Sequence, residues 1–194
     1  MGALSIRAAK IAVLSILAMN VWPATPALAE ASTINAADTA WMIVATAFVL
    51  MMTIPGLALF YSGMVRKKNV LATMAQSLAA VAIISILWVM FGYSLAFVGD
   101  GPWIGTLDRW FLIGMTMESV NPAAKTIPEA LFMLYQMTFA IITVALVAGA
   151  VADRMRFSAY LLFSVGWFMF VYVPLAHWVW GGGLDSQKSF FLWR

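Results

Sequence analysis

Few side chains in this sequence could carry out chemistry, and the most notable of them are aromatic. The chain's single histidine, His177, stands three residues before Trp180, and three glycines follow that tryptophan. An accessible indole can hold a cation against its ring face, but tryptophan also favours the membrane–water boundary on general grounds. The stretch Pro174–Gly183 therefore predicts either a cation site at a pore mouth or an interfacial anchor followed by a loop.

The sequence offers little for catalysis or for metal binding. It has no cysteine, so it can form neither a disulfide nor a thiolate metal site. It contains no recognisable nucleophile–base pair and no phosphate-binding loop. The charged cluster Asp153, Arg154 and Arg156 is typical of a turn between helices. We therefore expect no enzyme activity and no cofactor.

Composition defines the class of protein. The chain is 64% hydrophobic and 10% charged, whereas an ordinary soluble domain is about 25% charged. The net charge of +3 is small, and the basic residues between the apolar runs fall in short loops rather than in a patch. This distribution is typical of membrane topology and argues against nucleic-acid binding. We predict an all-α integral membrane protein in the lipid bilayer.

Residues 1–29 have the features of a cleavable signal peptide. Arg7 and Lys10 form a positive segment, Ile11–Val21 is a short apolar core, and Ala27–Ala29 gives a small-x-small cleavage pattern. The alternative is an uncleaved first helix. We predict cleavage, which leaves residues 30–184 as the membrane domain.

Four uncharged runs follow, and each is long enough to cross a bilayer, for which about 20 apolar residues suffice. We predict spans over residues 40–64, 70–98, 130–152 and 158–180. Basic short loops stay in the cytoplasm, and the two short loops here carry Arg66, Lys67, Lys68, Arg154 and Arg156. The sequence thus predicts a multi-pass protein of the inner (plasma) membrane whose mature N-terminus lies outside the cell.

Three local patterns indicate how the helices pack. Pro55 and Gly56 predict a kink within the first span. Ala145 and Gly149 have the small-x-x-x-small spacing that allows close helix approach. One face of the third span carries an aromatic and polar stripe, which predicts either a lined pathway or inter-helix packing; its residues are Phe132, Gln136, Phe139, Thr143 and Leu146, with Tyr135 at its border.

Four longer stretches are similar to the motifs of one known family. They are Met52–Leu71, Leu87–Phe97, Gly149–Ala159 and Pro174–Gly183. These stretches resemble the first four helices of the ammonium transporter (Amt/Mep/Rh) family. The resemblance runs from about residue 38 to residue 184. It implies a fold of eleven transmembrane helices per subunit, a homotrimer with one pathway in each subunit, and a cytoplasmic nitrogen-regulatory signal protein as a partner.

The resemblance also implies a site. The family recruits ammonium at an outer mouth through aromatic rings, and the matching positions here are Trp180, Phe139 and Tyr135. Burying a bare cation in hydrocarbon is prohibitive, and a desolvated cation–π contact returns only about 2 kcal/mol. We therefore expect ammonium to be held at the mouth, to shed its proton, and to cross a hydrophobic pore as neutral ammonia or by a separated route.

The sequence departs from the family after Gly183. A relative would continue into a fifth helix with a pore histidine, whereas residues 185–194 form a divergent tail. We therefore predict a truncated form, with the first four transmembrane helices of the eleven-helix fold, that does not conduct alone. The alternatives are a non-conducting remnant of a transporter gene and an ammonium-sensing relative. His177 matches neither pore histidine of the family, and we expect it to be a packed interfacial residue.

Overall fold

The computed structural model describes residues 34–184 of the chain. These residues belong to one of two compact units, Ser32–Arg194. The predicted signal peptide, 1–29, and the predicted divergent tail, 185–194, lie outside the described residues. Every regular element between residues 34 and 184 is helical, apart from one isolated bridge between Asn121 and Ala124.

Four helical spans make up this part of the chain, and they agree closely with the spans predicted from hydropathy. Each is long and apolar enough to cross a membrane: Ala36–Met64, Lys67–Phe97, Glu129–Val151 and Phe157–Val179. Their α-helices are α2 (Ala36–Met51), α3 (Ala58–Met64), α4 (Val70–Leu87), α5 (Tyr93–Phe97), α6 (Glu129–Val151), α7 (Phe157–Trp167) and α8 (Val173–Val179). Three π-helical segments, Met52–Leu57, Trp88–Gly92 and Phe168–Tyr172, join the halves of spans one, two and four.

The first span begins at a cap and bends where proline predicts it. Asn35 caps α2, because its side-chain oxygen accepts hydrogen bonds from the backbone N–H groups of Ala37 and Asp38, at 2.8 and 3.2 Å. Further along, Ile54 leaves helical geometry, with φ −123° and ψ 107°, directly before Pro55. The predicted kink is confirmed.

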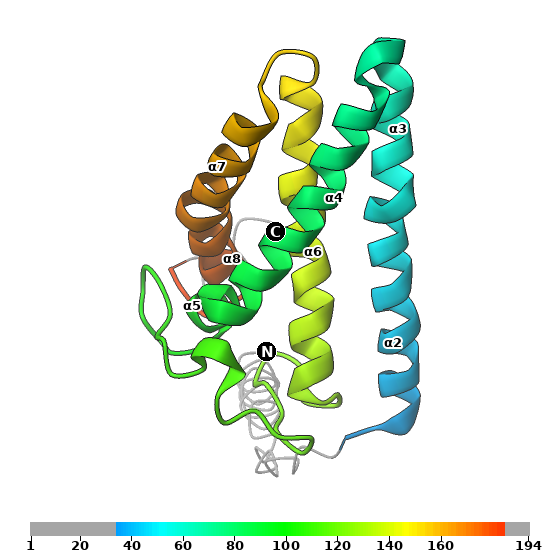
Figure 1. Ribbon diagram of the computed structural model, residues 1–194. Coiled ribbons are helices and arrows are strands. Elements are labelled where there is room, and N and C mark those ends of the chain that lie inside the picture. Colours follow the sequence, from blue (N-terminus) through cyan, green and yellow to red (C-terminus); the bar gives the residue numbers. More distant parts are fainter. Residues whose placement is uncertain (1–33, 185–194) are drawn as a thin grey trace, which may run out of the picture. The chain divides into compact units, whose positions relative to one another are not determined.

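The four spans alternate in direction, and α6 lies at their centre (Figure 1). It packs against α2, α4 and the α7 span, while α5 packs against α8. Both short turns meet at one end, where the Asp153 carboxylate accepts a hydrogen bond from the Asn69 amide and lies 3.8 Å from Arg66 Nε. The long loop, residues 98–128, lies at the other end, where the N–H of Asn35 donates to Thr126 O at 2.8 Å. We call these the short-turn end and the long-loop end.

Trp88 is the centre of the core. Its side chain is fully buried, and its indole N–H donates to the backbone oxygen of Met133 on α6, at 3.2 Å. Four rings meet it edge-on with centroids between 6.1 and 6.2 Å away; they are Tyr93, Phe97, Phe168 and Tyr172. Edge-to-face pairs add to the energy of apolar burial, so this cluster joins the second and fourth spans.

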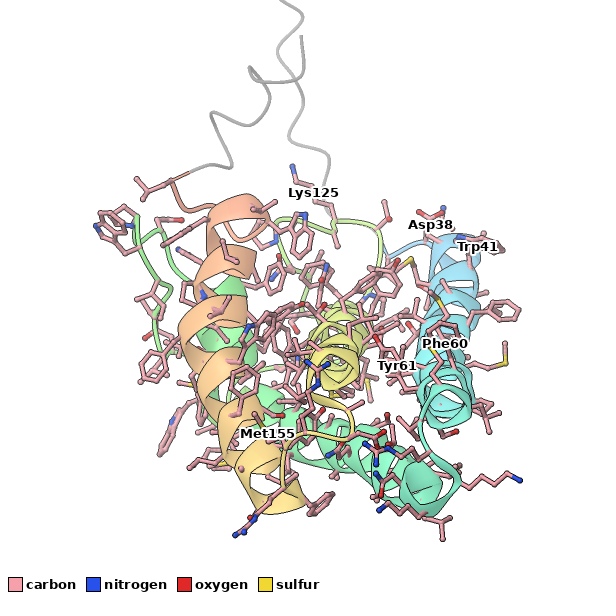
Figure 2. The ribbon with its side chains drawn as sticks, turned by 90° about the horizontal axis from the view of Figure 1, so that it is seen from above. Asp38, Trp41, Phe60, Tyr61, Lys125 and Met155 are labelled. Carbon is pink, nitrogen blue, oxygen red and sulfur yellow. The ribbon has the colours of Figure 1, made fainter. Side chains whose placement is uncertain are left out.

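The Tyr61 side chain of α3 packs over Gly149 of α6. A Cβ atom at Gly149 would come within 2.5 Å of the Tyr61 ring, and the Tyr61 hydroxyl donates to Leu146 O at 3.0 Å. Tyr61 points from α3 towards α6 in Figure 2. Gly149 therefore leaves room for the Tyr61 ring, while the close helix approach that the spacing of Ala145 and Gly149 allows stays a prediction.

Much of the first span is apolar and exposed. Helix α2 has no buried residue, and its Trp41 and Phe48 side chains are 69% and 57% exposed. Trp41 lies on the outer side of the bundle in Figure 2. Apolar surface of this extent suits a lipid environment or a helix–helix interface rather than water.

Candidate functional site at the long-loop end

Tyr135 and Phe139 lie one turn apart on α6 and contact each other. Their ring centroids are 5.0 Å apart, and their planes meet at 74°. Both side chains are half-buried. Successive turns of a helix place residues i and i+4 on one face, so the two rings form a continuous aromatic edge. The structure thus brings together two of the three predicted site residues.

Trp180, the third predicted site residue, follows α8 and is 53% exposed. It lines two cavities. One, of about 320 Å³, lies at the long-loop end beside Phe97, Asp100 and Asn121. The other, of about 200 Å³, also includes Thr143, which lies one turn beyond Phe139 on α6. Among the described residues no ring contact joins Trp180 to Phe139, so the structure does not bring the indole against the aromatic pair.

The predicted stripe on α6 is not uniform. Phe132 is 6% exposed and packs edge-on against Phe97, with centroids 5.1 Å apart. Gln136 and Thr143 are half-buried, and Leu146 is 49% exposed. Inter-helix packing therefore accounts for Phe132, whereas Thr143 lines the smaller Trp180 cavity.

His177 is a packed residue, as the sequence predicts. Its side chain is fully buried. Its Nδ1 atom lies 3.0 Å from the oxygen of Ala96, and its Nε2 atom lies 2.6 Å from the oxygen of Gly101. The neighbouring Trp178 indole donates to Trp103 O at 2.7 Å. These hydrogen bonds thus hold the end of α8 against the end of α5 and against the long loop.

Sequence reasoning missed a buried polar network at the same end. The Tyr93 hydroxyl donates to Glu129 Oε1 at 3.0 Å and accepts from the Asn121 amide at 3.0 Å. Glu129 is 3% exposed, and its Oε2 lies 3.4 Å from Arg109. A carboxylate in the first turn of α6 is also favoured by the helix dipole. The only signal in the sequence is the acidic residue that begins the third apolar run.

The site has no features of a metal centre. Within residues 34–184, no group of three or more histidine, cysteine, aspartate or glutamate side chains could hold a metal ion. The polar residues that line the larger cavity are Asp100 and Asn121. Together with an exposed indole, such groups can attract and orient a small cation.

Comparison with known proteins identifies the family. A sequence model of the Ammonium Transporter Family matches residues 40–191. The chain belongs to this family. It is 53% identical over 150 residues to an ammonium transporter of Bacillus subtilis, and 50% identical over 153 residues to a putative ammonium transporter of Methanothermobacter thermautotrophicus. In each case the match covers 77% of this chain and 37% of the relative.

Solved structures of the family have the same fold over this region. This chain aligns with the crystal structure of Saccharomyces cerevisiae Mep2 at a TM-score of 0.70 and 34% identity, over 80% of this chain and 35% of that one. Candida albicans Mep2 gives a TM-score of 0.69 at 34% identity, over 80% and 34% of the respective chains. The chain is therefore a multi-pass, all-helical membrane protein that spans a little over a third of the length of its relatives.

Proposed function

We propose that this chain forms the ammonium-holding mouth of an ammonium transport pathway, with Trp180, Phe139 and Tyr135 as the site residues. One observation carries the proposal: an exposed indole lies beside two cavities at the long-loop end of a chain of this family. The proposal takes this end to be the outside of the cell, because the opposite end carries the basic turns.

Electrostatics favours a cation at this position. A cation over the face of tryptophan gains about 0.5–1 kcal/mol when exposed and about 2 kcal/mol or more when desolvated. Asp100 lines the same cavity as Trp180, and a carboxylate raises the local concentration of cations. Asn121 also lines this cavity, but its amide N–H donates to the Tyr93 hydroxyl and its side-chain oxygen accepts from Ala123 N–H. Ammonium is thus attracted by the carboxylate and held by the indole face.

The same energies limit what can pass further inward. Removing a cation from water into an apolar interior costs far more than one cation–π contact returns. We therefore propose that ammonium gives up its proton, to water or to a separate proton path, and crosses as ammonia. Thr143, which lines the smaller Trp180 cavity, and the half-buried side chains of Phe139 and Tyr135 form one wall of the proposed route.

Two further parts of the proposal rest on the family. We propose that the complete assembly is a homotrimer in the plasma membrane, regulated by a cytoplasmic nitrogen-regulatory signal protein. The apolar surface of α3 and of the later half of α2, which includes Phe48 and Phe60, provides area for lipid and for a neighbouring subunit. The short-turn end, with Arg66 and Asp153, provides the polar surface for a cytoplasmic partner.

Methylammonium uptake tests the proposal. Residues 40–184 replace the matching segment of the Bacillus subtilis ammonium transporter, and the chimera is expressed in a strain without its own transporters. Trp180→Leu and Phe139→Ala should each impair uptake at equal surface expression, because an aliphatic side chain cannot hold a cation by its face. Trp41→Leu, an exposed tryptophan far along the chain from the site, is the matched control. Wild-type uptake by both site variants would remove these residues from the mechanism, and ammonium binding without uptake by the unsubstituted chimera would favour a sensor.

A further inference from the structure

The end of α5 and the long loop each present a backbone oxygen to the same side chain. Ala96 lies in the last turn of α5 (Tyr93–Phe97), and carbonyl groups in a last turn have no partner within their own helix. Gly101 lies in the loop that follows. His177 reaches both oxygens, at 3.0 Å from Nδ1 and 2.6 Å from Nε2. Its ring is fully buried, so water does not compete for these contacts.

The chemistry of imidazole suits this position. Backbone oxygens only accept hydrogen bonds, so a ring nitrogen that faces one must donate. A neutral imidazole donates from one nitrogen and a protonated imidazole from both. Phenylalanine fills a similar volume but donates from neither edge, and leucine also has no donor. Histidine therefore holds one or both segments in place where an apolar residue would only fill space.

The turn that carries Trp180 wraps around the same residue. The backbone oxygen of His177 accepts from the N–H groups of Gly181 and Gly183, each at 3.0 Å. A Cβ atom at Gly181 would lie 1.8 Å from Ala96 O, and one at Gly183 would lie 2.9 Å from the imidazole ring. Only glycine allows the backbone to pass this close. Trp180 stands between His177 and this glycine turn.

We infer that His177 is a positioning residue that fixes the Trp180 indole at the mouth of the site. It acts through its ring, which joins α8 to Ala96 and Gly101, and through its backbone oxygen, which closes the turn at Gly181 and Gly183. The Trp180 side chain is 53% exposed, and its backbone N–H donates to Ala176 O, at 2.9 Å, and to His177 O. Its placement therefore depends on the turn. The role in ammonium binding rests on the proposed function, whereas the placement of the indole does not.

Fluorine NMR of the whole chain tests the placement directly. The protein is labelled with 5-fluorotryptophan and placed in lipid nanodiscs, so that each of its nine tryptophans gives one signal. Trp180→Phe and Trp41→Phe assign the signals of these two residues. His177→Phe should shift or broaden the Trp180 signal and leave that of Trp41, which lies on α2, unchanged. His177→Gln, whose amide still donates, should return the Trp180 signal towards its wild-type position.

The same spectra can also contradict the inference. An unchanged Trp180 signal in a folded His177→Phe protein would overturn the inference, because packing alone would then place the indole. If His177→Phe does not fold, the Trp180 signals of His177→Gln and Gly183→Ala test the inference instead. A Trp180 signal that moves in Gly183→Ala but keeps its wild-type position in His177→Gln supports the inference. A signal that stays in place in Gly183→Ala contradicts it.

Ammonium titration separates this inference from the proposed function. Ammonium chloride, with sodium chloride as the control salt, should shift the Trp180 signal to saturation in the wild-type chain. In His177→Phe the apparent dissociation constant should rise about tenfold, the factor that corresponds to the loss of about one hydrogen bond. If ammonium moves no signal in the wild type, the proposed function fails, while the comparison of variants still decides whether His177 places Trp180.

Discussion

The contact between Gly149 and Tyr61 gives a prediction that can be worked through in numbers. A Cβ atom at residue 149 would lie 2.5 Å from the Tyr61 ring, so in Gly149→Ala the ring must move. Its hydrogen bond to Leu146 O, now 3.0 Å long, would then be lost. A lost hydrogen bond costs about 1 kcal/mol, and overpacking costs about 1–3 kcal/mol. Better helix propensity returns at most about 1 kcal/mol. We expect a net loss of about 2 kcal/mol.

Gly166 provides the matched control. It also lies inside a helical span, α7, but has no atom within 4 Å of an added Cβ. Gly166→Ala should therefore leave stability unchanged or raise it by at most about 1 kcal/mol. Tyr61→Ala removes the ring that a Cβ atom at residue 149 would meet. In the Tyr61→Ala background, Gly149→Ala should therefore cause little further loss of stability.

Reversible unfolding of the chain in mixed detergent micelles measures these free energies. Intrinsic tryptophan fluorescence reports the transition, because Trp88 is fully buried in the folded state. Equal stabilities of Gly149→Ala and Gly166→Ala would refute the reasoning. The same holds if Gly149→Ala remains just as costly in the Tyr61→Ala background, because the clash with the ring would then not be the cause.

The remaining predictions concern the buried network and the topology. Arg109→Met should destabilise the chain by about 3 kcal/mol, because it leaves the buried Glu129 carboxylate without its cationic partner. The added substitution Glu129→Gln should recover most of this loss in the same unfolding assay. If stability is not recovered, the ion pair is unimportant. Because the chain has no cysteine, Lys125→Cys at the long-loop end should react with a membrane-impermeant thiol reagent in intact cells and Lys68→Cys should not; the reverse pattern would invert the proposed orientation.

The sequence was sufficient to predict the spans because lipid imposes one simple requirement on them. Uncharged runs of sufficient length must become helices, since their backbone groups have no other partners in hydrocarbon. The kink at Pro55 could also be predicted, because it follows from the residue's own stereochemistry. These features are local, so the surrounding structure cannot easily override them.

The parts of the site that could not be predicted depend on pairs of residues distant in the chain. Trp88 meets rings from the fourth span, and its indole N–H finds a backbone oxygen 45 residues away. In the sequence, Glu129 is an ordinary charged residue at the start of a helix. Only the structure shows that Tyr93 and Arg109 contact its carboxylate. His177 could be predicted as packed, but its two backbone acceptors lie 81 and 76 residues away. Periodicity carries no information about such partners.

Equilibrium binding of ¹⁵N-labelled ammonium is the measurement that tests the central claim most directly. The chain in nanodiscs is titrated with labelled ammonium, and the broadening of the ammonium resonance reports binding without any need for transport. We predict saturable broadening by the wild-type chain, strong weakening by Trp180→Leu, and no change by Trp41→Leu, which alters an exposed tryptophan of α2. Equal broadening by the wild type and by Trp180→Leu would contradict the claim that this indole holds the cation.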